Sequence, residues 1–450
     1  MKVAVIGAGV IGVTTAYELA ADGHDVTVFE RRGSVAAETS FANAGVVAPG
    51  YVTPWAGPGM PRKVLGHLMS RHAPVRVHAG LSLGEIEWMW RWWRACEPGA
   101  YRTNRLRMQR LAFFSRERLH RLTRDLKLDY ERGTGYLVLL RTAKDAAMVR
   151  PGLSTPTELN TRHEMLDAEQ CRAVEPGLSD ETPLHGGVYL PDDEVGNCRQ
   201  FSTLLRAEAQ RIGVRFRFHT RVERILAGAA PELVHVYAPP EDSATVLMHA
   251  NAESAPNEAQ DTQPMALDPV TERFDAVAVC AALESVALLR PLGLRLPMQA
   301  VHGYSITLPL RRLDAHGDIG PRSALMDERY KVAISRLGAR VRVAGSAEIG
   351  GAAGRHDPRA IETLYKVLHD WFPGSTQLNQ AQVWKGARPM LPDGPPVLGR
   401  SGVEGVWVNL GHGSSGWALS CGSARVLADS IAGRVPAIDV DGLGMERLKR

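Results

Sequence analysis

The chain has 450 residues, of which 44% are hydrophobic, so it is long enough for the two substantial cores of a two-domain enzyme. The net charge is only +4 and the basic residues are dispersed, which gives no support to nucleic-acid binding. The five cysteines are odd in number, form no CxxC pair and follow no secretion signal, so we expect reduced thiols in a cytoplasmic protein without a metal site.

The chain begins with two short apolar stretches around a helix-like one. Val3–Ile6 predicts a buried strand, Val10–Ala20 a helix and Val26–Phe29 a second strand. A basic residue before an apolar run is also a feature of signal peptides, but this run contains acidic residues and no cleavage pattern. It is also too polar to span a membrane, so we interpret it as part of the folded protein.

Three glycines join the first predicted strand to the helix as Gly7-x-Gly9-x-x-Gly12. The first allows a tight turn, the second lets backbone amides reach a pyrophosphate, and the third lets the helix pack on the strand. The helix N-terminus adds partial positive charge for that anion. Glu30 lies 21 positions after Gly9, near the offset at which a carboxylate meets a ribose hydroxyl. The unit therefore predicts an adenine dinucleotide site.

The next segments contain a loop and a long helical region. Thr39–Pro61 is rich in Gly, Pro and Ala, which suits close approach of the backbone to a ligand. Glu85–Cys96 contains four tryptophans and continues into an Arg-rich helical stretch, Tyr101–Leu126. We interpret the tryptophans as helix-packing residues, the alternatives being a ligand cage or a membrane anchor.

The middle of the chain returns to strands. We predict strands at residues 136–140 and 187–190, and we interpret the acids in Pro191–Glu194 as a solvated turn rather than a metal site. Pro239–Glu272 lacks periodicity and is predicted to be a flexible surface insertion. Helix and strand patterns on either side of it imply that the dinucleotide domain is built from discontinuous segments; these patterns lie at residues 201–211, 214–218 and 274–280.

One arginine in the last quarter of the chain is a candidate for anion binding. Arg388 lies within Trp384–Arg400, where neighbouring Gly and Pro residues predict a rigid backbone. A guanidinium held in this way suits bidentate binding of a carboxylate. The alternative is an arginine that holds a loop in place through backbone carbonyls, and this stretch alone does not decide between them.

A second strand, glycine turn and helix follow near the end of the chain. Val406–Leu410 predicts the strand, residues 411–416 the turn and 417–431 the helix. If a flavin occupies the site, the positive helix N-terminus faces the ring's N1 and C2 carbonyl, where negative charge develops on reduction. His412 contacts either the flavin or substrate, or only the turn itself.

Seven stretches from end to end of the chain resemble one family. They are VAVIGAGVIGV at 3–13, ETSFANAGVVAPGY at 38–51, PDDEVGNC at 191–198, GYSIT at 303–307, DERYKVAISR at 327–336, WKGARPMLPDGPPVLGR at 384–400 and NLGHGSSGW at 409–417. The family is the D-amino acid oxidase superfamily of FAD-dependent oxidoreductases, and the likeness is strongest to the small subunits of bacterial D-amino acid dehydrogenases.

The resemblance implies an α/β fold in two domains. A discontinuous, doubly wound FAD-binding (Rossmann-like) domain joins a second, α+β substrate domain whose sheet covers the flavin. We expect the FAD-binding domain to comprise residues 1–60, 197–290 and 395–450. The substrate domain then comprises residues 61–196 and 291–394, and the insertion at 239–272 lies within the first of the two domains.

The resemblance also implies site residues. Arg388 matches the arginine that grips the substrate carboxylate, Tyr304 and Tyr330 are pocket walls or amine contacts, and His412 is a further candidate. Gly7, Gly9, Gly12 and Glu30 hold the ADP half of FAD. Further residues assigned to the cofactor are Val5, Ile6, Ala8, Val10, Ile11 and Arg31. Ser40, Asn43, Ala44 and Gly45 line the diphosphate and ring region, Val222 is also assigned to the cofactor, and the pyrimidine edge is met by Gly411, His412, Gly413, Ser414, Ser415 and Gly416.

Two positions depart from the family pattern. The strand ending at Cys280 is usually followed by a glycine where this chain has Ala282, so we expect a slightly wider backbone approach to the cofactor there. A Lys or Arg commonly precedes the GYS stretch, whereas this chain has His302. We expect that change to alter substrate preference or pH dependence without changing the reaction.

The implied reaction is oxidative deamination of D-amino acids such as D-alanine to 2-oxo acids and ammonia, by hydride transfer from Cα to flavin N5. By the same resemblance the electrons pass to a quinone or respiratory carrier, and the protein associates peripherally with the inner face of the cytoplasmic membrane. The alternatives are an oxygen-using oxidase of glycine, sarcosine or D-hydroxyproline, an NAD-dependent enzyme, and a non-catalytic FAD-binding subunit of a larger complex.

Overall fold

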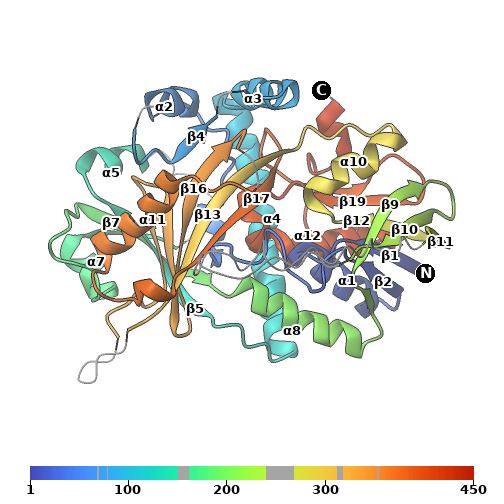
Figure 1. Ribbon diagram of the computed structural model, residues 1–450, viewed down its shortest axis with the longest axis horizontal. Coiled ribbons are helices and arrows are strands. Elements are labelled where there is room, and N and C mark those ends of the chain that lie inside the picture. Colours follow the sequence, from blue (N-terminus) through green and yellow to red (C-terminus); the bar gives the residue numbers. More distant parts are fainter. Residues whose placement is uncertain are drawn as a thin grey trace, which may run out of the picture.

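A computed structural model describes residues 1–67, 70–78, 80–149, 162–239, 268–311, 318–351 and 354–449. Within these residues the chain forms two large sheets, each flanked by helices, in adjoining halves of the molecule (Figure 1). The N-terminal strands, in blue, share one half with the C-terminal strand and helix, in red. The two halves are therefore interleaved in the sequence.

The first sheet has six strands among the described residues. In spatial order they are β18 (Val397–Arg400), β19 (Val406–Leu410), β12 (Ala276–Val279), β1 (Lys2–Ile6), β2 (Asp25–Phe29) and β8 (Arg215–Arg217). Neighbours from β19 to β8 are parallel, and only β18 pairs antiparallel. Because these strands come from widely separated segments, the predicted discontinuous, doubly wound sheet is confirmed.

The strands of this sheet are apolar because both faces are covered. Val3 and Val5 of β1 point into one core, while Ala4 and Ile6 point into the other. The first core is closed by α1 (Val10–Ala21), α4 (Pro98–Asp125), α8 (Cys198–Arg211) and α12 (Gly416–Ile431). The second is closed by α10 (Ser285–Leu289) and a small antiparallel sheet of β9 (Thr220–Leu226), β10 (Glu232–Tyr237) and β11 (Val270–Arg273).

The second sheet has ten described strands and is mostly antiparallel. Its main path is β17 (Gln382–Met390), β13 (Gln299–Pro309), β16 (Arg340–Ile349), β15 (Val332–Leu337), β14 (Ala324–Asp327), β5 (Gly133–Leu140), β7 (Gly186–Val195) and β3 (Val46–Val47). Two further strands pair with it, β4 (Val75–Val77) beside β16 and β6 (Glu164–Asp167) beside β7. Helix α11 (Pro358–Trp371) packs on β13, β15 and β16. The remaining α-helices with assigned bounds are α2 (Met60–His67), α3 (Leu83–Ala95), α5 (Ala143–Val149) and α7 (Ala168–Val174).

Helix α4 lies with the first sheet, not the second. Residues 98–125 fall in the segment 61–196 that the sequence places in the substrate domain, but Met108, Leu111 and Leu119 share the core of α1 and α12. The apolar side of the helix packs on α12, and Arg118 on its flank pairs with the buried Glu18 of α1. The predicted domain boundaries are placed from glycine and strand patterns, which do not indicate which core a long helix joins. The boundaries themselves remain a prediction.

The prediction of a solvated turn at Pro191–Glu194 is wrong. Strand β7 runs through these residues, and the side chains of Asp193 and Glu194 are buried. Arg116 lies 3.2 Å from Asp193, and the Glu194 carboxylate meets His120 at 2.9 Å. Arg116 of α4, far away in the sequence, offsets part of the cost of burying Asp193.

The four tryptophans of α3 divide between two environments. Trp88 and Trp92 are buried, as predicted for helix packing, whereas Trp90 and Trp93 are 53% and 59% exposed. In the part of the chain that the structure describes, no helix has the length and apolarity to cross a bilayer. Of the predicted insertion at 239–272, residues 240–267 lie outside the described residues, and its last residues already belong to β11.

Candidate active site between the two sheets

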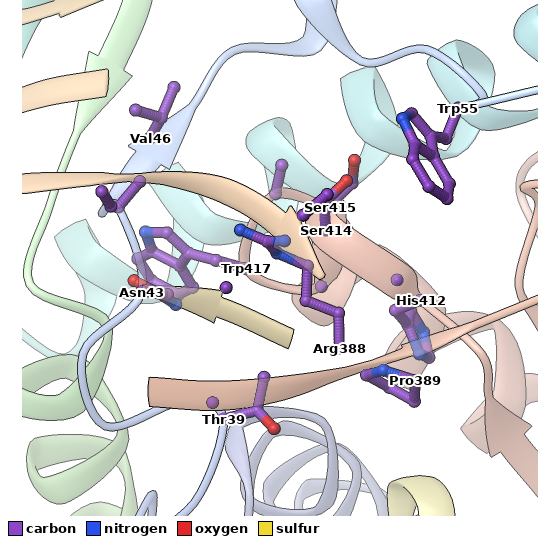
Figure 2. A pocket seen from close by; sticks show the side chains of 18 of the residues that line it. Thr39, Asn43, Val46, Trp55, Arg388, Pro389, His412, Ser414, Ser415 and Trp417 are labelled. Carbon is purple, nitrogen blue, oxygen red and sulfur yellow. The ribbon is translucent and has the colours of Figure 1, made fainter. Parts of the chain in front are cut away.

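A cavity of about 1850 Å³ is lined from both sheets. The first sheet contributes the turn after β1 and the turn after β19, and the second contributes β13, β16 and β17. Figure 2 shows part of its wall, with Arg388 between Trp417 and Asn43 on one side and His412 on the other. The two predicted glycine turns and the predicted arginine therefore meet at one cavity.

The first glycine turn has the close contacts that require glycine. Gly7 has a φ of +99°, and a Cβ there would lie 2.8 Å from the Cys280 carbonyl oxygen. A Cβ on Gly12 would lie 1.9 Å from the Gly7 carbonyl oxygen, so only glycine lets α1 approach β1 this closely. Gly9 faces the cavity, and the Val10 amide beside it donates to Ser40 Oγ at 3.2 Å. Because Gly9, Val10 and Ile11 all line the cavity, the N-terminus of α1 is open to it, as an anion site requires.

The carboxylate of Glu30 is held at the end of β2. It accepts hydrogen bonds from the backbone N–H of Ala8 at 2.7 Å and of Arg32 at 2.8 Å. Burial raises the pKa of Glu30, and these two hydrogen bonds act in the opposite direction. Arg31 and Val222 also line this end of the cavity. Glu30 is therefore placed to bind a polar group and to brace the first turn.

The second glycine turn leads from β19 into α12. Gly411 and Gly413 have φ values of +75° and +57°, which lets the chain turn sharply around His412. His412 is buried, with Nε2 3.1 Å from Ser423 Oγ, and burial lowers its pKa to about 3. Its imidazole is therefore neutral at physiological pH. Its backbone bridges to Met390, which ties this turn to β17.

Arg388 is a half-buried cation on the cavity wall. Its Nη1 donates to the Ser346 carbonyl oxygen at 2.9 Å, and no carboxylate among the described residues pairs with it. A Cβ on Gly303, across the β13–β17 ladder, would lie 2.2 Å from Arg388 Nη2, so glycine makes room for the guanidinium. Burial lowers the pKa of Arg388 to about 10. Because a partly desolvated charge without a counter-ion is costly, this arginine is suited to receive an anion.

The two tyrosines predicted for the pocket have different locations. Tyr304 lines the cavity, but its hydroxyl binds the Glu348 carboxylate and accepts from the Asp357 amide at 2.9 Å. Burial raises its pKa above the ordinary value. Tyr330 lies outside this cavity, with its ring packed against Arg141 and His72. The structure therefore brings Arg388, Tyr304 and His412 together but leaves Tyr330 elsewhere.

Some predicted cofactor residues line the cavity and others support it. Ile6, Gly7, Gly9, Val10, Ile11, Glu30, Arg31, Ser40, Asn43, Ala44, Val222 and Gly411–Gly416 line it. Four others lie behind this wall, namely Val5, Ala8, Gly12 and Gly45. Gly45 accepts from Trp417 Nε1 at 3.1 Å and donates to Asn43 Oδ1 at 2.9 Å, so it connects the loop after β2 to α12.

A family model described as FAD dependent oxidoreductase matches residues 2–430 of this chain. The chain belongs to this family. Its cofactor is therefore FAD, and the predicted resemblance, cofactor and fold class are confirmed. The fold class also agrees with solved structures. Glycine oxidase from Geobacillus kaustophilus has a TM-score of 0.71 at 18% identity, covering 99% of this chain and 98% of that one, a likeness that shows the fold alone.

Several relatives of this FAD-dependent oxidoreductase carry the same name. D-amino acid dehydrogenases from Cereibacter sphaeroides, Rhizorhabdus wittichii and Bradyrhizobium diazoefficiens are 42%, 41% and 41% identical to it. Each alignment covers 99% of this chain, and 95%, 100% and 99% of the respective relative. The likeness thus extends over the full length of the site described above.

The cavity fits FAD on its own geometry. The open N-terminus of α1 and the glycine turn suit a pyrophosphate, and Glu30 suits a ribose hydroxyl. The N-terminus of α12, which follows the turn at residues 411–416, presents a second partial positive charge to the same cavity. These features would hold the two ends of an extended dinucleotide.

Sequence reasoning missed several residues on this wall. Thr39 lines the cavity and donates from Oγ1 to the Ala387 carbonyl oxygen at 2.6 Å, so it ties the loop after β2 to β17. Trp55, Ser346 and Trp417 also line it. Thr39 and Trp55 fall in the glycine- and proline-rich segment that suits ligand approach, but nothing in its composition distinguishes them. Ser346 contributes a backbone carbonyl, which residue identity does not predict.

The departure at Ala282 has a structural consequence. Ala282 lines the cavity with a φ of +47°, a left-handed conformation that favours glycine. His302 lies in β13 within the buried part of the sheet, and burial and then Lys385 lower its pKa. Its effect on substrate preference remains a prediction.

Proposed function

We propose that this enzyme oxidises D-amino acids to 2-oxo acids and ammonia and passes the electrons to a quinone or respiratory carrier. The observation that carries the proposal is the half-buried guanidinium of Arg388 on the wall of an FAD cavity, with no carboxylate partner among the described residues. Relatives about 40% identical over the whole chain are named D-amino acid dehydrogenases, which supports the substrate class.

Arg388 would bind the substrate carboxylate. A guanidinium offers two parallel N–H donors to a carboxylate, and these hydrogen bonds are strong in a site without water. The Ser346 carbonyl fixes one edge of the guanidinium and leaves the rest toward the cavity. Binding at that point fixes the distance and orientation of the amino acid's Cα relative to the cavity wall.

FAD supplies the redox chemistry when bound, by accepting a hydride from the substrate's Cα. The protein's part is to orient the substrate and exclude water. The neutral imidazole of His412 adds no positive charge beside the substrate amine, so it does not oppose the cationic imine that forms as the hydride leaves. Tyr304 would form part of the wall rather than act as a proton donor, because its hydroxyl is already occupied.

Contact with the membrane follows from the proposed acceptor. Quinones dissolve in lipid, so an enzyme that reduces them must approach the bilayer. We therefore include in the proposal a peripheral association with the inner face of the cytoplasmic membrane.

The test is anaerobic mixing of the holoenzyme with a panel of D- and L-amino acids and glycine while the flavin absorbance is followed. Bleaching by D-amino acids alone is the expected result, and bleaching by L-amino acids alone would contradict the substrate class. Air-exposed turnover with rapid peroxide release would instead identify an oxidase. Failure of every amino acid to bleach the flavin would favour a non-catalytic subunit.

A further inference from the structure

Helices α2 and α3 form an apolar surface that the proposed chemistry does not use. Its exposed apolar residues, here called the α2–α3 face, are Leu65, Leu83, Ile86, Trp90 and Trp93. Their exposed fractions are 70%, 86%, 51%, 53% and 59% in that order. Figure 1 shows the two helices next to each other along one edge of the molecule. Large apolar side chains gathered at one edge are unusual on a soluble protein and mark an interaction site.

The exposed side chains are not a by-product of core packing. Helix α3 already buries Trp88 and Trp92, and Met60 and Val64 of α2 pack against the same cluster. Leu83, Ile86, Trp90 and Trp93 follow at helical spacing on a second, outward stripe. Packing α3 on the protein needs only the first stripe, so the second is available to a partner.

The charges around this face indicate an anionic bilayer. The helices carry Arg62, Lys63, Arg91 and Arg94 against Glu85 and Glu87, a net charge of +2. The Arg94 guanidinium lies 5.0 Å from the centre of the Trp90 ring. Tryptophan favours the boundary between lipid and water, and basic side chains nearby are attracted to anionic headgroups.

The FAD cavity opens beside this face. Met60, Arg62, Lys63 and Val64 of α2 line the cavity, and two of them, Arg62 and Lys63, are also exposed. An enzyme resting on a bilayer through α2 and α3 would therefore have this opening close to the lipid. That position suits an acceptor that is dissolved in the membrane.

We propose that the α2–α3 face docks the enzyme on an anionic lipid bilayer. Trp90 and Trp93 enter the interface, the arginines contact headgroups, and the cavity opening beside α2 lies next to the lipid. The benefit to catalysis rests on the proposed quinone acceptor, whereas the docking itself is measured independently of turnover.

The test is co-sedimentation of the holoenzyme with vesicles of phosphatidylcholine or of equimolar phosphatidylcholine and phosphatidylglycerol. The variant is Trp90→Ser with Trp93→Ser, and the matched control is Leu378→Ser with Val435→Ser, two residues that are 63% and 92% exposed outside these helices. We expect the wild type and the control to bind the anionic vesicles, more weakly at high salt. The tryptophan variant should bind at least about tenfold more weakly, because interfacial binding scales with buried apolar area.

Turnover with a soluble dye acceptor and FAD content should be unchanged in the tryptophan variant, which shows that it is folded. Equal vesicle binding by this variant and the wild type would overturn the proposal. Conversion of a dimer to a monomer by the same substitutions, seen by light scattering, would also overturn it and assign the face to a second copy of the chain. If the wild type shows no dye-linked turnover of D-amino acids, the proposed function is wrong. The vesicle binding would still decide whether the α2–α3 face docks on a bilayer.

Discussion

The charges around Glu18, beside the first sheet, and the charge of Arg388, on the cavity wall, differ in whether opposite charges compensate them. Glu18 in α1 is fully buried, yet Arg118 donates two hydrogen bonds to its carboxylate at 2.5 and 2.7 Å, and Arg425 donates a third at 2.8 Å. Among the described residues, Arg388 on the cavity wall has the Ser346 carbonyl as its hydrogen-bond partner and no carboxylate. The Glu18 carboxylate is thus paired with cations within the fold, whereas the Arg388 guanidinium has no such counter-ion among the described residues.

The pKa shifts of the two arginines follow this difference. Burial lowers the pKa of Arg425, but its bonds to Asp22 and its proximity to Glu18 raise it overall above the ordinary value. Burial alone acts on Arg388 and lowers its pKa to about 10. A compensated charge contributes to holding α1, α4 and α12 together, whereas an uncompensated charge costs stability that a ligand can restore. The comparison separates residues that serve the fold from one for which we propose a role in binding.

Replacement of Arg388 gives the sharpest test of that separation. Arg388→Leu should lower kcat/KM for D-alanine by about 10³-fold, or about 4 kcal/mol, mainly through KM, because the bidentate contact to the carboxylate is lost. FAD content and Tm should stay level or rise, because a partly desolvated charge without a counter-ion is removed. Steady-state kinetics with a dye acceptor, flavin absorbance and thermal unfolding measure the three quantities.

Arg388→Lys is the matched control, since it keeps the charge but not the two parallel donors. Its KM should lie between those of the wild type and Arg388→Leu. An unchanged KM in Arg388→Leu would remove this residue from substrate binding and leave it as an arginine that only ties β17 to Ser346.

Replacement of Glu18 should have the opposite pattern. Glu18→Gln leaves Arg118 and Arg425 without their shared carboxylate, so the protein should lose about 3 kcal/mol of unfolding free energy. The KM for D-alanine should be unchanged in the folded fraction. Denaturant unfolding with kinetics at low temperature checks both, with Glu362→Gln as a control in an exposed pair with Arg71 that should change stability little.

The same contrast explains which parts of the site could be predicted from the sequence. The two glycine turns depend on local geometry, such as the φ of +99° at Gly7 and +75° at Gly411, and a local motif carries that information. Arg388 was found because its rigid neighbours and the family resemblance both point to it. Its lack of a counter-ion depends on the fold and was not visible in the sequence.

The failures involve partners that are distant along the chain. Asp193 resembles a surface acid until Arg116, 77 residues away, is placed beside it. Tyr330 matches a family stretch, but whether its ring faces the cavity or Arg141 depends on the hairpin between β14 and β15. Thr39 bonds to Ala387, 348 residues later. Such contacts form only when segments far apart in the sequence are brought together by the fold, and the spacing of residues along the chain does not predict them.

Asp193 is an intermediate case and supplies a pH-dependent test. Burial raises its pKa to about 7 despite the arginine 3.2 Å away, so the folded protein binds a proton that the unfolded chain releases. This group therefore lowers stability as pH rises from about 4 to about 7, and the loss persists above pH 7. The stability advantage of Asp193→Asn over the wild type should therefore grow between pH 5 and pH 8, by at least about 1 kcal/mol. Melting curves of the two proteins across that pH range provide the measurement. If the stability difference between variant and wild type does not grow with pH, Arg116 compensates the charge of Asp193 fully.

The smallest expected effect concerns backbone strain rather than charge, at Ala282 on the wall of the same cavity. Ala282 holds a left-handed φ of +47° without a glycine, whereas its neighbour Ala281 has an ordinary φ of −87°. Ala282→Gly should relieve strain of about 1 kcal/mol and lose part of that gain to chain entropy, for a net stabilisation of about 0.5 kcal/mol. Ala281→Gly should only lose entropy and destabilise by about 0.5–1 kcal/mol. Thermal unfolding of both variants with FAD bound measures the two changes. Equal destabilisation by both would mean that the backbone at Ala282 is not strained. Stabilisation by Ala282→Gly with destabilisation by Ala281→Gly would show that the cavity wall carries backbone strain at Ala282 as well as an uncompensated charge at Arg388.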